Sequence, residues 1–129
     1  MTDATGRREL GLRKMTEVYG FDVTDSPGDE FFGYTVDHLF AEIWTREGLT
    51  MRERRLLLIG LLAGQGLNDV LDLQLPAALD NGELDAAELR EIVIFLTHYV
   101  GWPMGAKLNG QVEGLIARRE KAARRDGTA

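Results

Sequence analysis

Apolar residues recur at the three- and four-residue spacing of an α-helix along almost the whole chain. No segment shows the sustained alternation of apolar and polar residues that is typical of a half-buried strand. Helices are predicted over residues 6–19, 30–44, 51–64, 69–80, 86–100 and from about residue 103 onward. The pattern therefore predicts an all-α fold, a compact helical domain of about six helices.

The length of 129 residues is that of one domain. No repeat, linker or low-complexity segment interrupts the predicted helices, so residues 1–129 are expected to form a single domain. The last helix becomes polar by Arg118, and the basic tail over residues 118–129 is expected to be a solvated helix end.

Local signals mark where two of the helices begin. Thr50 and Glu53 form a capping box ahead of the third helix, and Asp85 and Glu88 form another ahead of the fifth. The third helix, as far as about Gly64, is apolar nearly all round, which predicts a place at the centre of the fold.

The fourth helix carries a polar residue, Gln74, on a face that otherwise looks buried. Asn68 is the expected N-cap of this helix, and Asn81-Gly82 is its expected stop. A buried amide needs partners, since an unsatisfied one costs about 1–3 kcal/mol. Gln74 is therefore either a core residue bonded to a neighbour or a pocket residue that orients a ligand carbonyl or a water. In neither case can it act as a general acid or base.

The composition excludes several kinds of chemistry. The chain has no cysteine, which excludes disulfides, thiolate metal sites and cysteine nucleophiles. Its net charge of −6 disfavours nucleic acid as a partner. The first ten residues lack the apolar core of a signal peptide, and the apolar run LLLIGLLAG from Leu56 is too short to span a bilayer. We therefore expect a cytoplasmic protein that binds neither nucleic acid nor a membrane.

Three segments match a known family in order and spacing. They are EIWTREGLTMRERRLLLIGLLAGQG from Glu42, AALDNGELDAAELREIV from Ala77 and YVGWP from Tyr99. Over residues 30–112 the chain resembles the carboxymuconolactone decarboxylase family, whose members are small and all-helical with the alkyl hydroperoxidase D-like fold. The resemblance implies this fold and assembly into trimers or hexamers. The matching positions are Trp44, Arg46, Gly48, Leu49, Arg52, Arg54, Asn81, Gly82, Glu88, Tyr99, Gly101 and Pro103.

The chain departs from the family pattern at the positions that carry the family's chemistry. Members with peroxidase activity have Cys-x-x-Cys followed four residues later by histidine, and here these places hold Leu67, Val70 and Gln74. Decarboxylase-like members usually keep the histidine, often with a glutamate four residues earlier. A histidine that members often carry on the next helix is replaced by Phe95. Thiol peroxidase activity is therefore excluded, and any proton transfer must come from other residues.

His38 is the first candidate for proton transfer, since histidine is the usual proton shuttle near neutral pH. It lies four residues after Tyr34 and four before Glu42, so the three share one stripe of a helix. His38 and Glu42 are the predicted catalytic residues, provided that another helix or subunit covers them; uncovered, the stripe is an ordinary solvated face. It lies about 140° from the predicted apolar stripe of the same helix, which comprises Phe32, Val36, Leu39, Phe40 and Ile43.

A carboxylated lactone that loses carbon dioxide needs a bidentate cation, an oxyanion donor and an acid. The predicted cations are Arg54 and Arg46. Arg52 and Arg54 lie about 200° apart around the helix, so at most one of them can point into a given pocket, and Arg54 is the one chosen. His38 with Glu42 is the one pair at metal-ligand spacing, and two ligands are too few, so no metal site is expected. No glycine-rich phosphate loop follows a strand, and no cofactor is expected. The other predicted substrate contacts are Gln74, Trp44, Tyr34 and His98. The alternatives are packing of the loop for Trp44 and a surface or interface position for His98.

Two functions are compatible with these residues. The first is a cofactor-independent enzyme, similar to carboxymuconolactone decarboxylase, that acts on a small carboxylated or lactone metabolite. The second is a family member that has lost catalysis and serves as a small-molecule-binding or assembly protein. The missing histidine favours the second, and the amide and the His38 stripe favour the first. A homo-oligomer is expected in both cases, because the third and fifth helices carry more apolar surface than one small bundle can bury.

Overall fold

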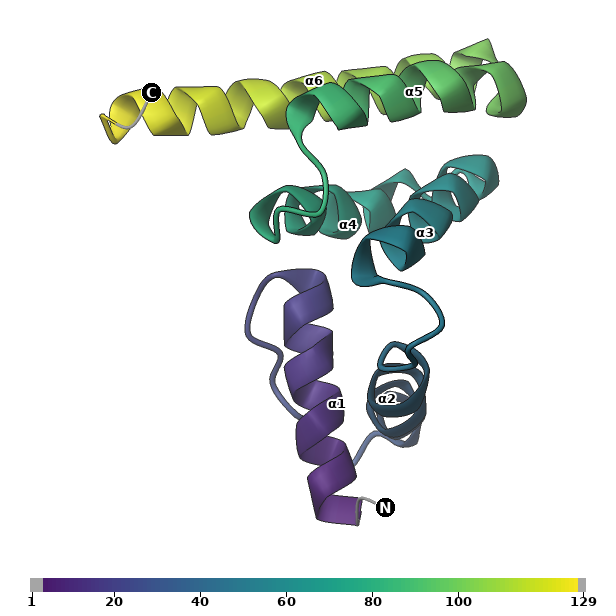
Figure 1. Cartoon of the computed structure of the whole chain (residues 1–129), viewed down its shortest axis with the longest axis vertical. Coiled ribbons are helices and arrows are strands. Elements are labelled where there is room, and N and C mark those ends of the chain that lie inside the picture. Colours follow the sequence, from purple (N-terminus) through teal and green to yellow (C-terminus); the bar gives the residue numbers. More distant parts are fainter. Residues whose placement is uncertain (1–3, 128–129) are drawn as a thin grey trace. The chain divides into compact units, whose positions relative to one another are not determined.

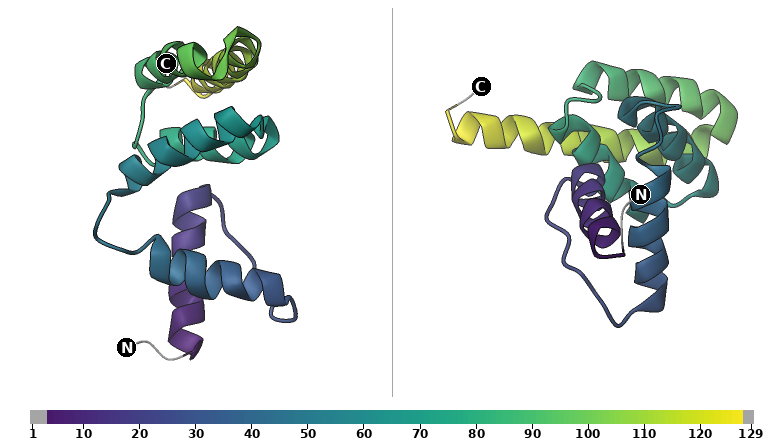
Figure 2. Two further views of the ribbon diagram at one scale, coloured as in Figure 1. Left: turned by 90° about the vertical axis from the view of Figure 1, so that its right-hand side faces the viewer. Right: turned by 60° about the horizontal axis from the view of Figure 1, so that its bottom comes forward.

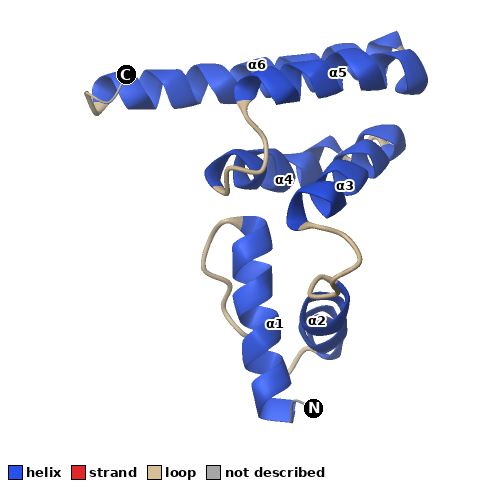
Figure 3. Cartoon of the chain, viewed as in Figure 1, coloured by secondary structure: helices blue, strands red, loops and turns tan. Residues whose placement is uncertain are grey.

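The computed structural model describes residues 4–127, which form helices joined by loops without any strand (Figures 1 and 3). The all-α prediction is confirmed, and the helix count agrees when α2 and η1 are taken as one continuous helix. None of the helices in the described part of the chain is long and apolar enough to cross a membrane. The elements are α1 (Ala4–Tyr19), α2 (Glu30–Tyr34), the π-helix η1 (Thr35–Ile43), α3 (Met51–Gln65), α4 (Asn68–Asp80), α5 (Ala86–Val100) and α6 (Trp102–Arg125).

The internal contacts divide the chain into two compact units. The N-terminal unit extends to Arg54 and contains α1, α2 and η1. The C-terminal unit begins at Arg55, inside α3, and contains α4, α5 and α6. The assignment of residues 1–129 to one domain stays a prediction.

In the N-terminal unit, α1 crosses the helix formed by α2 and η1 (Figure 2). Their shared core consists of Met15 and Val18 from α1 with Val36 and Phe40 from η1. The predicted apolar stripe is wrong in part, because Leu39 and Ile43 are exposed. The physical reason is the π-helical hydrogen bonding, in which Trp44 N donates to Leu39 O at 2.9 Å. A bond that spans five residues widens the turn and shifts later side chains around the axis.

Gly11 allows α1 to approach η1 closely. A Cβ atom at this position would lie 2.2 Å from the backbone oxygen of Val36, which cannot move without shifting η1. We expect Gly11→Ala to lower the free energy of unfolding by about 1–3 kcal/mol, as overpacking does elsewhere. Urea denaturation followed by circular dichroism measures this change.

Gly110→Ala is the matched control for this substitution. Gly110 lies inside α6, and no described atom would lie within 4 Å of its Cβ. Alanine is favoured over glycine in a helix by about 1 kcal/mol, so this variant should be equal to or more stable than the parent. Equal effects of the two substitutions would contradict the close approach at Gly11.

In the C-terminal unit, four helices enclose a second core. α5 and α6 run side by side in opposite directions (Figure 1). They meet closely where Gly105 lies against the buried Thr97. The fully buried core side chains come from all four helices and include Ile59, Ala63, Leu71, Leu75, Ala78, Leu89, Leu108 and Val112.

Only one face of α3 is buried, so the prediction that this helix lies at the centre of the fold is wrong in part. The buried face carries Arg55, Ile59, Leu62 and Ala63. On the opposite face Leu57 is 65% exposed and Leu61 54% exposed. The other helices of the C-terminal unit cover one side of α3, and the exposed Leu57 and Leu61 lie outside this core.

Both capping boxes are confirmed. Thr50 N donates to the Glu53 carboxylate and Glu53 N donates to Thr50 Oγ1, and Asp85 and Glu88 repeat this exchange. The stop after α4 is also confirmed, since Asn81 is the C-cap and Gly82 has a φ of +68°.

The N-cap prediction for α4 is wrong. Leu67 occupies the cap position, and Asn68 is the first helical residue. The Asn68 amide donates instead to Gln111 Oε1 on α6 at 3.0 Å. This contact between helices takes up the amide nitrogen in place of a local cap, whereas Asn68 Oδ1 is buried without a hydrogen-bond partner among the described residues.

Candidate functional site

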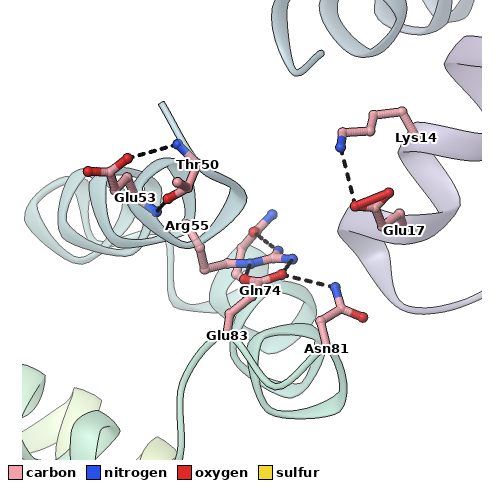
Figure 4. Close-up of polar contacts among 8 residues, drawn as sticks. All are labelled: Lys14, Glu17, Thr50, Glu53, Arg55, Gln74, Asn81 and Glu83. Atoms are coloured by element: carbon pink, nitrogen blue, oxygen red, sulfur yellow. Dashed lines mark hydrogen bonds and ion pairs between the residues drawn. The ribbon is translucent and has the colours of Figure 1, made fainter. Parts of the chain in front are cut away.

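Gln74 projects from α4 into the C-terminal unit and is 3% exposed. Its Oε1 accepts a hydrogen bond of 2.6 Å from Nη1 of Arg55, a residue on α3 that is fully buried (Figure 4). The amide oxygen therefore has the partner that a buried polar atom needs. Its expected part in substrate binding stays a prediction.

Glu83 completes this buried cluster. Its carboxylate accepts two hydrogen bonds from Arg55, from Nε at 2.7 Å and from Nη2 at 3.1 Å, and it accepts a third from Asn81 (Figure 4). The turn at Gly82 reverses the chain after α4 and brings Glu83 back toward α3. The guanidinium of Arg55 thus uses three nitrogen atoms on a carboxylate and an amide, an arrangement that compensates a buried charge.

The sequence pattern did not single out Arg55 and Glu83, which form the buried ion pair of this cluster. Arg55 lies four residues before Ile59 and seven before Leu62, so helical spacing alone places it on the buried face. A cation on an apolar face requires a buried carboxylate as partner. The helical spacing therefore predicts that Arg55 is buried and needs a carboxylate partner. It does not tell which acidic residue is the partner, because Glu83 reaches Arg55 only through the turn at Gly82.

A hollow in the N-terminal unit has a volume of about 630 Å³. It brings together three of the predicted site residues, Tyr34, His38 and Glu42, as their four-residue spacing predicts. The His38 side chain is 62% exposed, and its Nδ1 lies 3.7 Å from Glu42 Oε1. The hollow is lined by Arg7, Arg8, Pro27, Asp29, Glu30, Gly33, Tyr34, Asp37, His38 and Glu42.

Two guanidiniums from α1 enter the same hollow, and Arg8 is firmly held. Arg8 donates to both oxygens of Asp37, at 2.8 and 3.0 Å, and to Asp25 at 2.7 Å. These hydrogen bonds, that to Asp37 foremost, raise the pKa of Arg8 above its ordinary value. The Arg8 hydrogen bonds likewise hold the pKa of Asp37 below its usual range.

Arg7 is held more loosely. Its Nη1 lies 3.4 Å from Glu42 Oε1, and its side chain is 40% exposed. Glu42 thus stands between Arg7 and His38. Four carboxylates and two guanidiniums line this hollow, so a bound anion requires a guanidinium that can leave its own carboxylate.

The remaining predicted site residues lie elsewhere. Trp44 stacks on Phe40 with ring centroids 6.0 Å apart and packs against the N-terminal core. Arg54 donates through Nη1 to the backbone oxygen of Leu49. Arg46 is exposed after the end of η1. Their predicted roles in substrate binding stay predictions.

His98 lies in the C-terminal unit, in a hollow of about 300 Å³ next to Trp102. Its Nδ1 lies 2.7 Å from the backbone oxygen of Ile94, and its ring meets the Trp102 ring edge-on. No arginine, lysine or carboxylate lines this hollow among the residues that the structure describes. Within residues 4–127, no group of three or more His, Cys, Asp or Glu side chains is placed to hold a metal ion.

Comparisons with known proteins show what the chain is similar to. Residues 29–107 match the model of the carboxymuconolactone decarboxylase family. A 4-carboxymuconolactone decarboxylase from Acinetobacter baylyi is 29% identical over 104 residues, which cover 75% of this chain and 77% of that protein. The nitrosuccinic acid decarboxylase npaB from Metarhizium robertsii is 34% identical over 77 residues, 60% of this chain and 51% of that protein. No solved structure matches the chain. Because the family match spans more than half of its residues, the chain belongs to the carboxymuconolactone decarboxylase family.

Proposed function

We propose that this chain is a cofactor-independent decarboxylase of a small carboxylated or lactone metabolite, and that the hollow around His38 and Glu42 is its active site. The observation that carries the proposal is the gathering of an imidazole, two guanidiniums and four carboxylates, Glu42 among them, around one hollow of about 630 Å³. The names of two relatives, both decarboxylases, support the reaction class.

In the proposed reaction the bond between the substrate and its carboxyl carbon breaks, and carbon dioxide leaves. The electron pair moves into the adjacent carbonyl or lactone system and forms an enolate, or into the nitro group of nitrosuccinate and forms a nitronate. His38, in its protonated form, gives a proton to this anion and is then reprotonated from solvent. Glu42 orients the imidazole, and the Tyr34 hydroxyl can donate to the developing oxyanion.

A turnover assay with the full chain tests this proposal. 4-Carboxymuconolactone and nitrosuccinate are the first substrates to try, and EDTA in the buffer tests independence from metal ions. We expect carbon dioxide release above the buffer rate with at least one of them. Failure of both to release carbon dioxide at millimolar concentration would overturn the proposed reaction for these substrates.

One observation favours the alternative, a family member that binds small molecules or assembles without catalysis. The position where decarboxylase-like members keep a histidine holds Gln74, and its oxygen is already bonded to Arg55. A residue that cannot titrate and is held in the core gives no proton. Ligand binding at the His38 hollow without turnover would support this alternative.

We also propose that the chain forms a homo-oligomer, a trimer or hexamer as the family implies. Exposed apolar side chains on α3 and α5 support assembly, among them Leu57, Leu61, Phe95 and Tyr99. Gly64 on α3 also leaves space, since no described atom would lie within 4 Å of its Cβ. Exposing these apolar side chains to water is unfavourable in free energy, and an interface between subunits would bury them.

The double variant Leu57→Glu/Leu61→Glu should dissociate this assembly. Two carboxylates on an apolar interface lose their hydration when it forms, so we expect the mass in solution to fall to that of one chain. Light scattering after size-exclusion chromatography measures the mass, and Ala117→Glu on α6 is the control for added charge. An unchanged mass in the double variant would place the interface elsewhere.

A further inference from the structure

The hollow around His38 contains two arginines that differ in their freedom to bind a ligand. Arg8 donates from Nε, Nη1 and Nη2 to Asp37 and Asp25, at distances between 2.7 and 3.0 Å. These are the distances of charge-assisted hydrogen bonds, and two of them form a bidentate pair. Arg8 therefore ties α1 to η1 and to the intervening loop, and it is not available to a substrate.

Arg7, in contrast, is held only weakly and is free to bind a ligand. The 3.4 Å between Arg7 Nη1 and Glu42 Oε1 is longer than a good hydrogen bond. Both side chains are partly exposed, and an exposed ion pair at such a distance contributes little to stability. A ligand carboxylate that approaches Arg7 in bidentate geometry therefore gains more than the broken pair loses.

The two residues that face each other here come from different parts of the chain. Arg7 lies on α1, which precedes the family match over residues 29–107, whereas Glu42 and His38 lie within it. The α1 helix thus adds a cation to a hollow whose opposite wall comes from the matched segment. The Arg7 guanidinium can therefore select substrates whose carboxylate lies next to α1 in the hollow.

We infer that Arg7 binds the substrate carboxylate and that Glu42 leaves Arg7 when it does so. The inference rests on the proposed function, because it assigns the substrate-binding residue of that site. Glu42 then keeps one charged partner of this set, His38, whose Nδ1 is 3.7 Å away. When the substrate is bound, Glu42 is therefore released from Arg7 and orients the His38 imidazole. Arg7 is the specificity residue, and Glu42 is the positioning residue.

Binding of succinate to the full chain, measured by isothermal titration calorimetry, tests this inference without turnover. The neutral diamide succinamide is the paired probe. We expect succinate to bind at least tenfold more tightly than succinamide, and Arg7→Gln to weaken succinate binding at least tenfold. Glu42→Gln should strengthen it severalfold, because the competing carboxylate is removed. Arg13→Gln, an exposed position on the same helix, should leave it unchanged.

The outcomes separate the inference from the proposed function. Succinate binding that is absent, or unchanged in Arg7→Gln, overturns the inference, and so does weaker binding in Glu42→Gln. If the chain turns over a substrate, Arg7→Gln should raise KM more than it lowers kcat, and an unchanged KM would also overturn it. Binding that depends on Arg7 in a chain without decarboxylase activity would support the inference and count against the proposed reaction. Circular dichroism of each variant confirms that α1 remains folded.

Discussion

Glu83→Ala should lower the free energy of unfolding by about 3–5 kcal/mol, because it leaves a buried guanidinium without its carboxylate. Arg55 is fully buried, and the Glu83 side chain is 6% exposed. After the substitution, the Gln74 oxygen is the remaining side-chain acceptor of this cluster for Arg55. Since small domains are stable by about 5–15 kcal/mol, a loss of this size would leave the C-terminal unit close to unfolding.

Urea denaturation of the full chain, followed by circular dichroism, measures the loss. The matched control is Glu113→Ala, which breaks the pair that Glu113 forms with Arg90 at 2.8 and 3.0 Å. That pair has the same bidentate geometry but side chains that are 48% and 43% exposed. Water screens exposed pairs, so the control should leave the unfolding free energy nearly unchanged. Similar losses in both variants would contradict the burial argument.

The double variant Arg55→Met/Glu83→Leu distinguishes a lost charge partner from lost packing. It removes both charges and keeps apolar volume, which is often neutral or stabilising for a buried pair. We expect it to be more stable than Glu83→Ala, although Gln74 loses its donor. A double variant that is less stable than the single one would mean that the pair itself contributes most of the stability.

The ends of the helices could be predicted from the sequence where the signal lies within one turn. The capping boxes at Thr50 and Asp85 need contacts only three residues apart, and both are present. Asn68 shows the limit of such signals. Its amide bonds to Gln111, 43 positions away, and no local pattern distinguishes this contact from a cap.

The burial of Gln74 could be predicted from its neighbours on the helical wheel, but its partner could not. Arg55 is one of several arginines near the start of α3, and only its place relative to Ile59 distinguishes it. Glu83 reaches it because Gly82 adopts a positive φ and turns the chain back. The sequence shows that a turn occurs there, and the path of the chain after it decides the contact.

Only the part of the hollow around His38 that comes from one helix could be predicted from the sequence. The four-residue spacing of Tyr34, His38 and Glu42 places them on one stripe, and the structure has them lining one hollow. Arg7 and Arg8 join them because α1 packs against η1. This packing depends on Gly11, a tertiary requirement that no spacing along one helix reveals.

His38→Asn should lower the rate of carbon dioxide release by 10²- to 10⁴-fold, the usual contribution of a positioned general acid. Asparagine keeps a polar side chain of similar reach but cannot transfer a proton near neutral pH. Because His38 is largely exposed, its loss should change the unfolding free energy by less than about 0.5 kcal/mol. The expected signature is therefore a large fall in kcat in a chain that remains fully folded and still binds succinate.

His98→Asn is the matched control, since it makes the same chemical change at the second of the two histidines. His98 lies beside Trp102, in a hollow without a charged side chain among the described residues, and its removal should leave the rate within about threefold of the parent. A rate that falls in His98→Asn and stays constant in His38→Asn would move the proton donor to the C-terminal unit. A rate that is constant in both would exclude histidine as the acid, and the enolate would then take its proton from Tyr34 or water.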